Sequence, residues 1–240
     1  MELAAGIIPA RYNSTRFPGK PLALIKGRPM IQWVYEAARG ARLLERVVVA
    51  TDDERIAAAC RGFEAEAVMT SPSLGSGTER VADASYVIEN NIIINIQGDE
   101  PLVSGGMIDS LVEVFQDPGV RMASVMRRET DPALLADPNR VKVVVDQDGW
   151  ALSFSRFAPP SLDTDFFFLH VGIYGYRKDF LREFCAWPPS RLERQERLEQ
   201  LRALENGVRI KMVETIHPAL SVDSPQDIIE VEKYLDRTSP

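Results

Sequence analysis

The chain has 240 residues, a hydrophobic fraction of 45% and a formal net charge of -7 at pH 7, which fits one α/β domain with a sizeable core. The acidic balance argues against nucleic-acid binding through a broad basic surface, but it leaves room for a small anionic ligand held by local cations. The two cysteines, Cys60 and Cys185, lie far apart. They exclude a disulfide scaffold and predict a reducing, cytoplasmic location. No signal peptide and no membrane insertion are expected.

The first predicted strand, Leu3 to Ile8, leads into a loop that is rich in cations. Arg11, Arg16 and Lys20 follow the strand within twelve residues, together with prolines and a glycine. Loops after buried strands of α/β sheets bind ligands, and fixed cations with free backbone N–H groups suit a triphosphate. The alternative is a solvated, charged turn. For Arg16 both interpretations, nucleotide contact and solvated surface, stay open.

Strands and helices alternate over the next fifty residues. A helix begins after Pro29, a β-branched strand covers residues 46–51, an N-capped helix follows Asp53, and a short strand covers residues 65–69. This alternation predicts βαβ units in a mainly parallel sheet. A Rossmann dehydrogenase is excluded, because Pro9, Ala10 and Arg11 stand where that fold needs a glycine-rich turn.

Two further loops carry candidate ligand-binding residues. Residues 71–80 are rich in Ser and Gly and precede a helix from about Thr78 to Ile88, so that a ligand can approach the backbone and the helix N-terminus. The most apolar strand, residues 92–96, is expected at the centre of the sheet. Asp99 follows its carboxyl end and is a candidate Mg²⁺ ligand, with a simple turn aspartate as the alternative.

Residues 129–175 are expected to form a small lobe inserted into a single domain that spans residues 1–240. Strands at 141–146 and 151–156 flank an Asp148-Gly149 turn, which is typical of a β-hairpin. Three aromatics at 166–168 follow. The aromatics belong either to the core or to an interface, and such an insert often forms a small lobe or a dimer surface. Together with the family resemblance described below, it predicts a homodimer.

The C-terminal third adds further candidates. In the strand from Leu169 to Arg177, His170 and Tyr174 share a face that either lines a pocket or meets solvent. One helix is expected from Ser190 to about Glu205. A strand is expected at 208–213 and a last helix at 228–235. Asp223 precedes that helix and is a second candidate ligand for the same metal ion.

The motifs together resemble the 3-deoxy-manno-octulosonate cytidylyltransferase family over essentially the whole chain. The segments that carry the resemblance are residues 8–12, 14–16, 18–22, 76–80, 97–101, 154–156, 170–176, 198–202 and 222–225. The resemblance implies an α/β three-layer sandwich of the nucleotide-diphospho-sugar transferase type, with a mostly parallel mixed sheet and a small β-hairpin dimerisation lobe. It also implies CMP transfer from CTP to 3-deoxy-D-manno-octulosonate (KDO) for bacterial lipopolysaccharide synthesis.

The resemblance also assigns roles to residues of this chain. Catalysis is expected from Arg11, Lys20, Asp99 and Asp223, with Mg²⁺ on the two aspartates. Nucleotide contacts are expected from Ala10, Arg11, Ser14, Lys20, Ser76, Gly77, Arg80 and Gln97. Contacts with the sugar acid are expected from Arg156, His170, Tyr174, Glu199 and Gln200.

Two departures from the family pattern concern the sugar acid. Leu169 stands where relatives often carry Arg or Lys, and the segment before Ser76 lacks a His found in some members. The alternative substrate is 8-amino-KDO. Enzymes for that sugar tend toward Gln after the first metal aspartate, where this chain has Glu100. A non-enzymatic nucleotide-binding module is a different alternative, although it would be expected to lose Lys20 or one of the aspartates.

Overall fold

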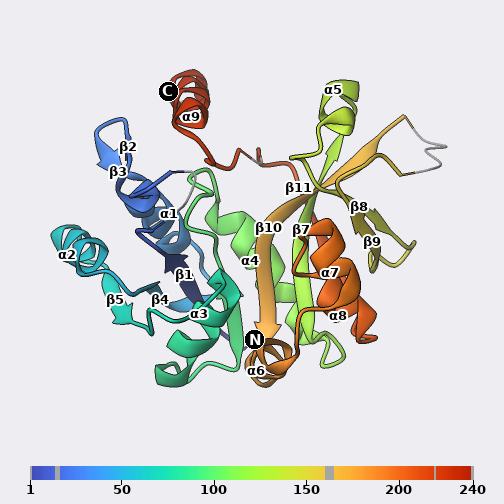
Figure 1. Ribbon diagram of the computed structural model, residues 1–240, viewed down its shortest axis with the longest axis horizontal. Helices are drawn as coiled ribbons and strands as arrows, with labels where there is room; N and C mark the ends of the chain where they lie inside the picture. The colour runs from blue at the N-terminus through green and yellow to red at the C-terminus, as the bar shows by residue number, and fades with distance from the viewer. Residues whose placement is uncertain (1, 14–16, 160–164, 219, 239–240) are drawn as a thin grey trace.

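The computed structural model describes residues 2–13, 17–159, 165–218 and 220–238. The described residues form a nine-stranded sheet whose main path has the order β11-β7-β10-β6-β1-β4-β5, with the hairpin β8–β9 branching from β10 (Figure 1). The strands are β1 (Ala4–Ala10), β4 (Leu44–Thr51), β5 (Glu66–Met69), β6 (Ile92–Asn95), β7 (Met122–Glu129), β8 (Lys142–Val145), β9 (Ala151–Ser155), β10 (Phe167–Arg177) and β11 (Ile210–Thr215). A separate two-stranded ribbon joins β2 (Leu24–Ile25) and β3 (Arg28–Pro29).

Helices cover both faces of the sheet. One face carries α1 (Met30–Arg39), α2 (Glu54–Gly62) and α4 (Gly105–Glu113). The other carries α3 (Gly77–Ala84), α6 (Lys178–Ala186), α7 (Arg191–Glu196) and α8 (Leu201–Glu205). The short helix α5 (Pro132–Ala136) and the final helix α9 (Pro225–Thr238) lie at the edge where the site forms (Figure 1). This arrangement confirms the predicted three-layer α/β class.

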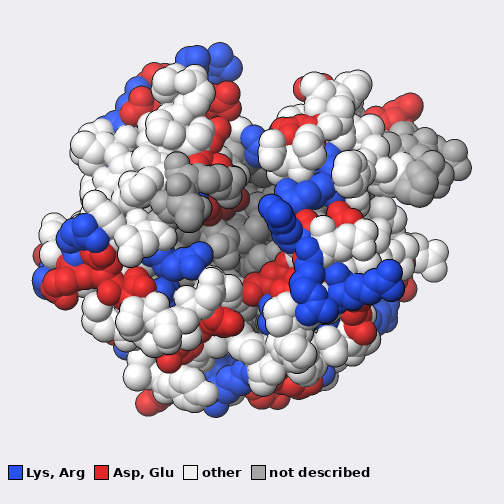
Figure 2. Space-filling view, viewed as in Figure 1, with Lys and Arg blue, Asp and Glu red and all other residues white. Residues whose placement is uncertain are grey.

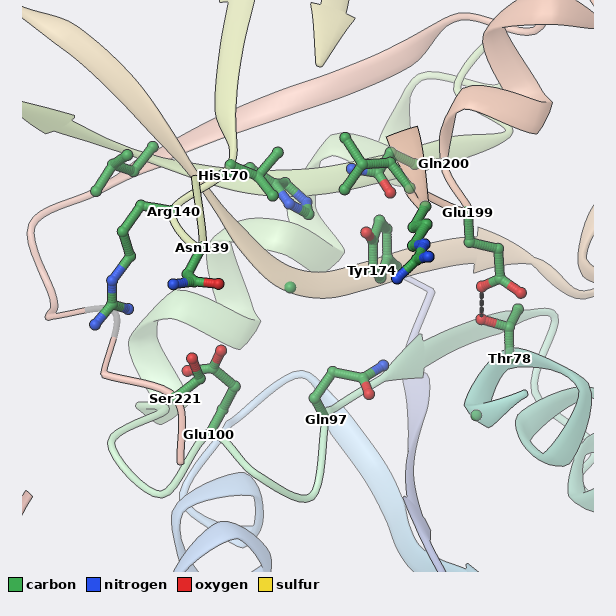
Figure 3. Close-up of a pocket in the computed structure, with 16 residues that line it drawn as sticks. Thr78, Gln97, Glu100, Asn139, Arg140, His170, Tyr174, Glu199, Gln200 and Ser221 are labelled. Atoms are coloured by element: carbon green, nitrogen blue, oxygen red, sulfur yellow. Dashed lines mark hydrogen bonds between the residues drawn. The ribbon is translucent and has the colours of Figure 1, made fainter. Parts of the chain in front are cut away.

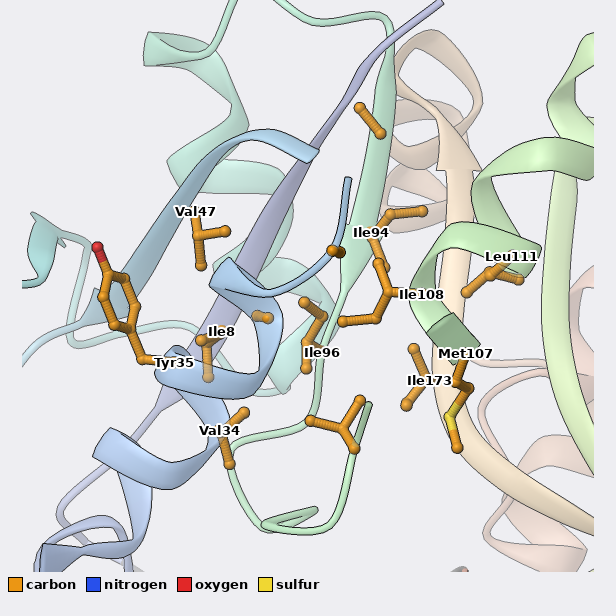
Figure 4. Packing of buried hydrophobic residues seen from close by; sticks show 14 of the residues in the cluster. Ile8, Val34, Tyr35, Val47, Ile94, Ile96, Met107, Ile108, Leu111 and Ile173 are labelled. Atoms are coloured by element: carbon orange, nitrogen blue, oxygen red, sulfur yellow. The ribbon is translucent and has the colours of Figure 1, made fainter. Parts of the chain in front are cut away.

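The alternation of side chains along the strands creates two separate cores. Ile8 and Ile94 face α1 and α4, whereas Ile7 and Ile93 face α3 and α6. On the first face, Val34 of α1 and Ile108 of α4 close over the strands (Figure 4). Because β1 and β6 are buried on both faces, they are continuous apolar runs, as central parallel strands require.

β10 is antiparallel to both of its neighbours, β6 and β7. Its first half therefore lies at the edge of the sheet where the site forms. β6 pairs parallel to β1, but β10 pairs antiparallel to both β6 and β7. The part of β10 that precedes Tyr174 therefore extends past the carboxyl end of β6, where Tyr174 pairs with Asn95. A register shift between Val171 and Tyr174 interrupts the pairing with β7, and such bulges redirect side chains next to binding sites.

The single helix predicted from Ser190 to Glu205 is wrong. α7 ends at Glu196, Arg197 adopts a left-handed conformation with φ 56°, and α8 starts only at Leu201. Helical spacing of the leucines suggested continuity, but tertiary packing breaks the helix. The break places Glu199 and Gln200 at the wall of a cavity.

Several predicted boundaries also differ from the structure. The strand expected at 208–213 covers Ile210–Thr215, and α9 begins at Pro225 instead of Ile228. The hairpin is formed as expected by β8 and β9. Its role in dimerisation stays a prediction. Among the described residues, none of the helices combines the length and the apolar character needed to span a membrane.

Candidate active site

Two adjoining cavities open at the carboxyl ends of β1 and β6. The first, which we call the Lys20 cavity, has a volume of about 370 Å³ and is lined by Ala10, Arg11, Lys20, Asp99 and Asp223 among others. The second, the His170 cavity, has a volume of about 330 Å³ and is lined by His170, Tyr174, Glu199 and Gln200 among others. Gly77 and Gln97 line both. The space-filling view shows a hollow in the middle of this face (Figure 2).

Lys20 joins the two predicted metal ligands. Its Nζ lies 2.6 Å from Asp99 Oδ2 and 3.6 Å from Asp223 Oδ1. It also donates a hydrogen bond of 2.9 Å to Val222 O, and Val222 N donates to Asp99 O over 2.9 Å. Residues from three distant parts of the chain thus meet at one point. The Lys20 ammonium therefore lies between the two carboxylates.

A sharp turn at Gly19 in the cation-rich loop brings Lys20 back to the end of β1. Gly19 has φ 72°, a left-handed conformation that favours glycine, and its N–H donates to Tyr12 O over 2.8 Å. Arg11 donates a hydrogen bond from Nη1 to Gly75 O over 3.0 Å. This bond links the cation-rich loop to residues 71–80, which we call the Ser-Gly loop. Ser14 and Arg16 lie outside the described residues.

The Ser-Gly loop ends in a fully formed N-terminal cap of α3. Ser76 accepts a hydrogen bond from Glu79 N and completes a capping box with the Glu79 side chain. Gly77 borders both cavities, and a Cβ there would lie 3.4 Å from Pro9. Arg80 lines neither cavity. Its side chain is fully buried and binds Asp52 Oδ2 at 2.9 Å, and it also donates to Thr70 Oγ1.

His170 is held as a neutral imidazole. Burial lowers the pKa of His170 from its ordinary value of 6.5 to about 3. Its Nε2 lies 2.8 Å from Ser124 Oγ, and the Ser124 hydroxyl donates its hydrogen to Ile173 O over 2.8 Å. Because that hydroxyl has only one hydrogen, His170 Nε2 carries a proton and donates, and Nδ1 is left as an acceptor.

Glu199 and Gln200 occupy the opposite side of the same cavity. Burial raises the pKa of Glu199, although hydrogen bonds from Thr78 and the charge of Arg202 oppose the rise. Thr78 Oγ1 donates to Glu199 Oε2 (Figure 3). Arg202 Nη2 lies 3.6 Å from Glu199 Oε1. Gln200 is only 3% exposed, and its Nε2 has no hydrogen-bond partner in the described part of the chain. A buried, unpaired donor at a cavity wall indicates a ligand acceptor.

Arg156, expected at the sugar acid, does not line the cavity. Its guanidinium donates from Nε to Glu196 O at 3.0 Å, from Nη1 to Pro138 O at 3.1 Å and from Nη2 to Arg197 O at 3.4 Å. It therefore ties the loop before β8 to the break between α7 and α8.

The sequence reasoning missed part of the cavity lining. The additional polar residues are Thr78, Glu100, Asn139, Arg140, Arg197 and Ser221. Burial and the neighbouring Asp99 carboxylate raise the pKa of Glu100 to about 8. The position of Glu100 directly after Asp99 in the sequence could have identified it as a residue of the cavity. No periodicity marks Asn139 and Arg140, because they lie in an irregular loop whose position depends on contacts distant in sequence.

Comparison with known proteins agrees with this geometry. The family model described as cytidylyltransferase matches residues 5–210. Proteins named 3-deoxy-manno-octulosonate cytidylyltransferase from Geobacter sulfurreducens and Solibacter usitatus are each 48% identical; the alignments cover 96% and 95% of this chain and 97% and 92% of the relatives.

A solved structure shows the same likeness in three dimensions. It is a CMP:2-keto-3-deoxy-manno-octonic acid synthetase complexed with CTP, 38% identical, with a TM-score of 0.93 over 99% of this chain and 100% of that one. A cytidylyltransferase from Leptospira borgpetersenii, 14% identical with a TM-score of 0.68, covers 100% of this chain and 89% of its own and shares the fold. The chain therefore belongs to the cytidylyltransferase family and, within it, to the 3-deoxy-manno-octulosonate cytidylyltransferases.

Proposed function

We propose that this protein transfers CMP from CTP to the anomeric 2-hydroxyl of KDO, releasing CMP-KDO and diphosphate. The observation that carries the proposal is the pair of cavities sharing Gly77 and Gln97. One cavity offers cations and two carboxylates, which suits a triphosphate and a metal ion. The other offers a neutral His, Tyr, Gln and Glu, which suits a polyhydroxylated sugar. The names of the relatives and the CTP complex of the similar structure support this pairing of substrates.

The chain's own residues contribute mainly position and charge. The sugar hydroxyl attacks the α-phosphorus in line, and the bond to the β-phosphate oxygen breaks. Phosphoryl-group transfer of this kind needs little covalent chemistry from the protein. In this proposal Arg11 and Lys20 bind the triphosphate and stabilise the negative charge on the departing diphosphate. The N-terminus of α3 offers free backbone N–H groups beside Gly77.

The two aspartates fit Mg²⁺. The described residues contain no cluster of three or more His, Cys, Asp or Glu side chains that could hold a metal. Mg²⁺ in nucleotide enzymes is commonly bound by one or two carboxylates, with phosphates and water as further ligands. Asp99 and Asp223 lie on either side of the Lys20 ammonium and meet that requirement. When bound, the ion would lower the pKa of the attacking hydroxyl and neutralise charge on the phosphates.

The His170 cavity offers complementary groups for sugar hydroxyls. Nδ1 of the neutral His170 accepts a hydrogen bond and Gln200 Nε2 donates one. The Glu199 carboxyl accepts a hydrogen bond, and it can also donate one when it is protonated. Tyr174 keeps its phenolic proton, because burial raises its pKa. These roles of His170, Tyr174, Glu199 and Gln200 belong to the proposal. Supply of CMP-KDO to lipopolysaccharide synthesis, a cytoplasmic location and a homodimer also belong to it.

The test is a diphosphate-release assay with CTP, Mg²⁺ and either KDO or 8-amino-KDO. We expect higher kcat/KM with KDO. Asp99→Asn is expected to lower kcat at least about 100-fold, because charge stabilisation at the reacting phosphates is lost. Asp148→Asn, an exposed turn residue, is the matched control and should keep wild-type turnover. Normal turnover of Asp99→Asn would refute the metal role, and preference for 8-amino-KDO would refute the substrate.

A further inference from the structure

Tyr12 belongs to the cation-rich loop but lies outside the Lys20 cavity. Arg11, Asn13 and Lys20 line that cavity, whereas Tyr12 does not. Its half-buried ring packs instead against the core on the face of the sheet that carries α1 and α2. The side chain of Tyr12 therefore supports the loop from behind and makes no contact with a ligand in the cavity.

Tyr12 and Gly19 close the cation-rich loop at its base. Gly19 N donates to Tyr12 O over 2.8 Å, and a Cβ on Gly19 would lie 3.3 Å from Tyr12 Cζ, so the ring lies against the Gly19 backbone. Arg11 directly precedes this closure and Lys20 directly follows it. The geometry of the closure therefore sets the separation of the two cations that line the cavity.

Arg55, the second residue of α2, stacks on the ring of Tyr12. Its guanidinium carbon lies 3.2 Å from the centre of that ring, which is a direct cation–π contact. Asp53 holds the guanidinium with two bonds, at 2.9 Å from Nε to Oδ1 and at 2.6 Å from Nη2 to Oδ2. Two parallel bonds of this kind fix the plane of the guanidinium, although the side chain of Arg55 is largely exposed.

Asp53 connects this stack to the central sheet. As the N-cap of α2 it accepts a hydrogen bond from Arg55 N over 2.9 Å, and its own N–H donates to Thr51 Oγ1 over 3.2 Å. Thr51 is fully buried at the end of β4, where it pairs with Ala10 at the end of β1. The contacts thus run from the sheet through Asp53 and Arg55 to Tyr12, and they return to the chain beside Ala10.

A loop braced in this way suits the binding of a polyanion. When the loop is held before the ligand arrives, less conformational entropy is lost as the binding side chains become ordered. Exposed ion pairs and cation–π contacts contribute little to the stability of a whole fold. The effect of this cluster is therefore expected on the loop that it contacts, and so on the cations at either end of that loop.

We propose that Tyr12 and Arg55 are positioning residues for nucleotide binding. Their stack, held by Asp53, sets the separation of Arg11 and Lys20 before CTP enters the cavity. The inference rests on the proposed function, because it assumes that these two cations bind the triphosphate. It adds the start of α2, which lines neither cavity, to the determinants of CTP affinity.

The test compares the binding of CTP with the use of KDO. The Kd for CTP with Mg²⁺ is measured by calorimetry, and KM is measured separately for CTP and for KDO. Arg55→Met should raise the Kd and KM for CTP about 3-fold, the size expected for an exposed cation–π contact, and leave the KM for KDO unchanged. Tyr12→Leu should raise both CTP constants about 10-fold, because the contact with Gly19 is lost as well.

Further variants separate positioning from general damage. Arg61→Met is the matched control, because Arg61 is an exposed arginine of the same helix and pairs with Glu54; it should bind CTP as the wild type does. Arg55→Lys keeps a cation and Tyr12→Phe keeps the ring, so each should retain part of the affinity lost in Arg55→Met and Tyr12→Leu. The double variant should bind CTP no more weakly than Tyr12→Leu alone, because the two residues act through one contact.

The outcomes distinguish this inference from the proposed function. CTP binding by the wild type, with the same Kd in Arg55→Met and Tyr12→Leu, would overturn the positioning role alone. An equal rise in KM for CTP and KDO would also overturn it, since the damage would not be confined to the nucleotide. Failure of the wild type to bind CTP would overturn the proposed function and this inference with it. Should Tyr12→Leu not fold, the two variants of the exposed Arg55 decide the question.

Discussion

At the scale of single residues, burial decides which groups of the site carry charge. His170 is neutral and has a defined tautomer, because the only hydroxyl hydrogen of Ser124 is already donated to Ile173 O. Glu100, with a pKa raised to about 8, has a different protonation state from an ordinary surface carboxylate at neutral pH. Neither state follows from residue type. The polar wall of the His170 cavity therefore offers hydrogen bonds more than charge, apart from its arginines.

A pH-dependent stability is expected from His170. Its pKa is about 3 in the folded protein and 6.5 ordinarily, so the unfolded chain binds the extra proton first as the pH falls. The free energy of unfolding should therefore decrease from pH 6.5 toward pH 3. In urea unfolding, the wild type should lose about 1.4 kcal/mol more than His170→Gln between pH 7.5 and 5.5. Parallel pH profiles of the two proteins would contradict a buried, neutral His170.

At the scale of secondary-structure elements, interruptions place the site residues. The left-handed Arg197 separates α7 from α8 and leaves Glu199 and Gln200 at the cavity. Arg202 of α8 holds α7 in place through Glu193, with Nε–Oε2 and Nη2–Oε1 distances of 2.8 and 2.5 Å. The bulge in β10 plays a similar role on the opposite wall, where it brings His170 to Ser124. Irregular geometry at these positions has a local function.

Two adjacent glycines at the start of α4 offer a controlled test of element packing. A Cβ on Gly105 would lie 2.6 Å from the backbone C and O of Gly40, whereas a Cβ on Gly106 would meet nothing within 4 Å. Gly105→Ala should lower the free energy of unfolding by about 1–3 kcal/mol, because backbone must move to accept the methyl group. Gly106→Ala should be neutral or stabilise by up to about 1 kcal/mol. Equal unfolding midpoints for the two variants would show that α4 does not pack this closely.

At the scale of the whole molecule, the site is assembled from residues that lie far apart in the sequence. Lys20 follows the first strand, Asp99 follows β6, and Asp223 precedes α9, yet all three meet at one ammonium group. α9 helps to hold this arrangement, since Val231 packs with Ile25, Met30 and Val222 in a separate small core. The two cavities therefore depend on the same sheet edge.

The expected homodimer can be tested on the hairpin. Leu152 in β9 and Phe157 just after it are 61% and 69% exposed. Exposed apolar side chains on an inserted hairpin suit burial against a second copy of the chain. Light scattering after size exclusion should give twice the mass of the chain for the wild type, and the chain mass for Leu152→Asp with Phe157→Asp. Val87→Asp, 59% exposed and distant from the hairpin, should stay dimeric. A monomeric wild type would refute the prediction.

The fold class and the central strands could be predicted from the sequence, because the signals for them are local. Apolar runs, turn residues and caps depend on neighbours within a few positions. The sequence also indicated that Lys20, Asp99 and Asp223 lie at strand and helix ends. Contacts between distant parts of the chain bring these residues together and break the helix after Ser190. Such contacts also bury Arg80 against Asp52 and engage Arg156 with two loops. Only the tertiary structure revealed Arg140 as a cavity residue, because the position of an irregular loop is set by contacts far away in sequence.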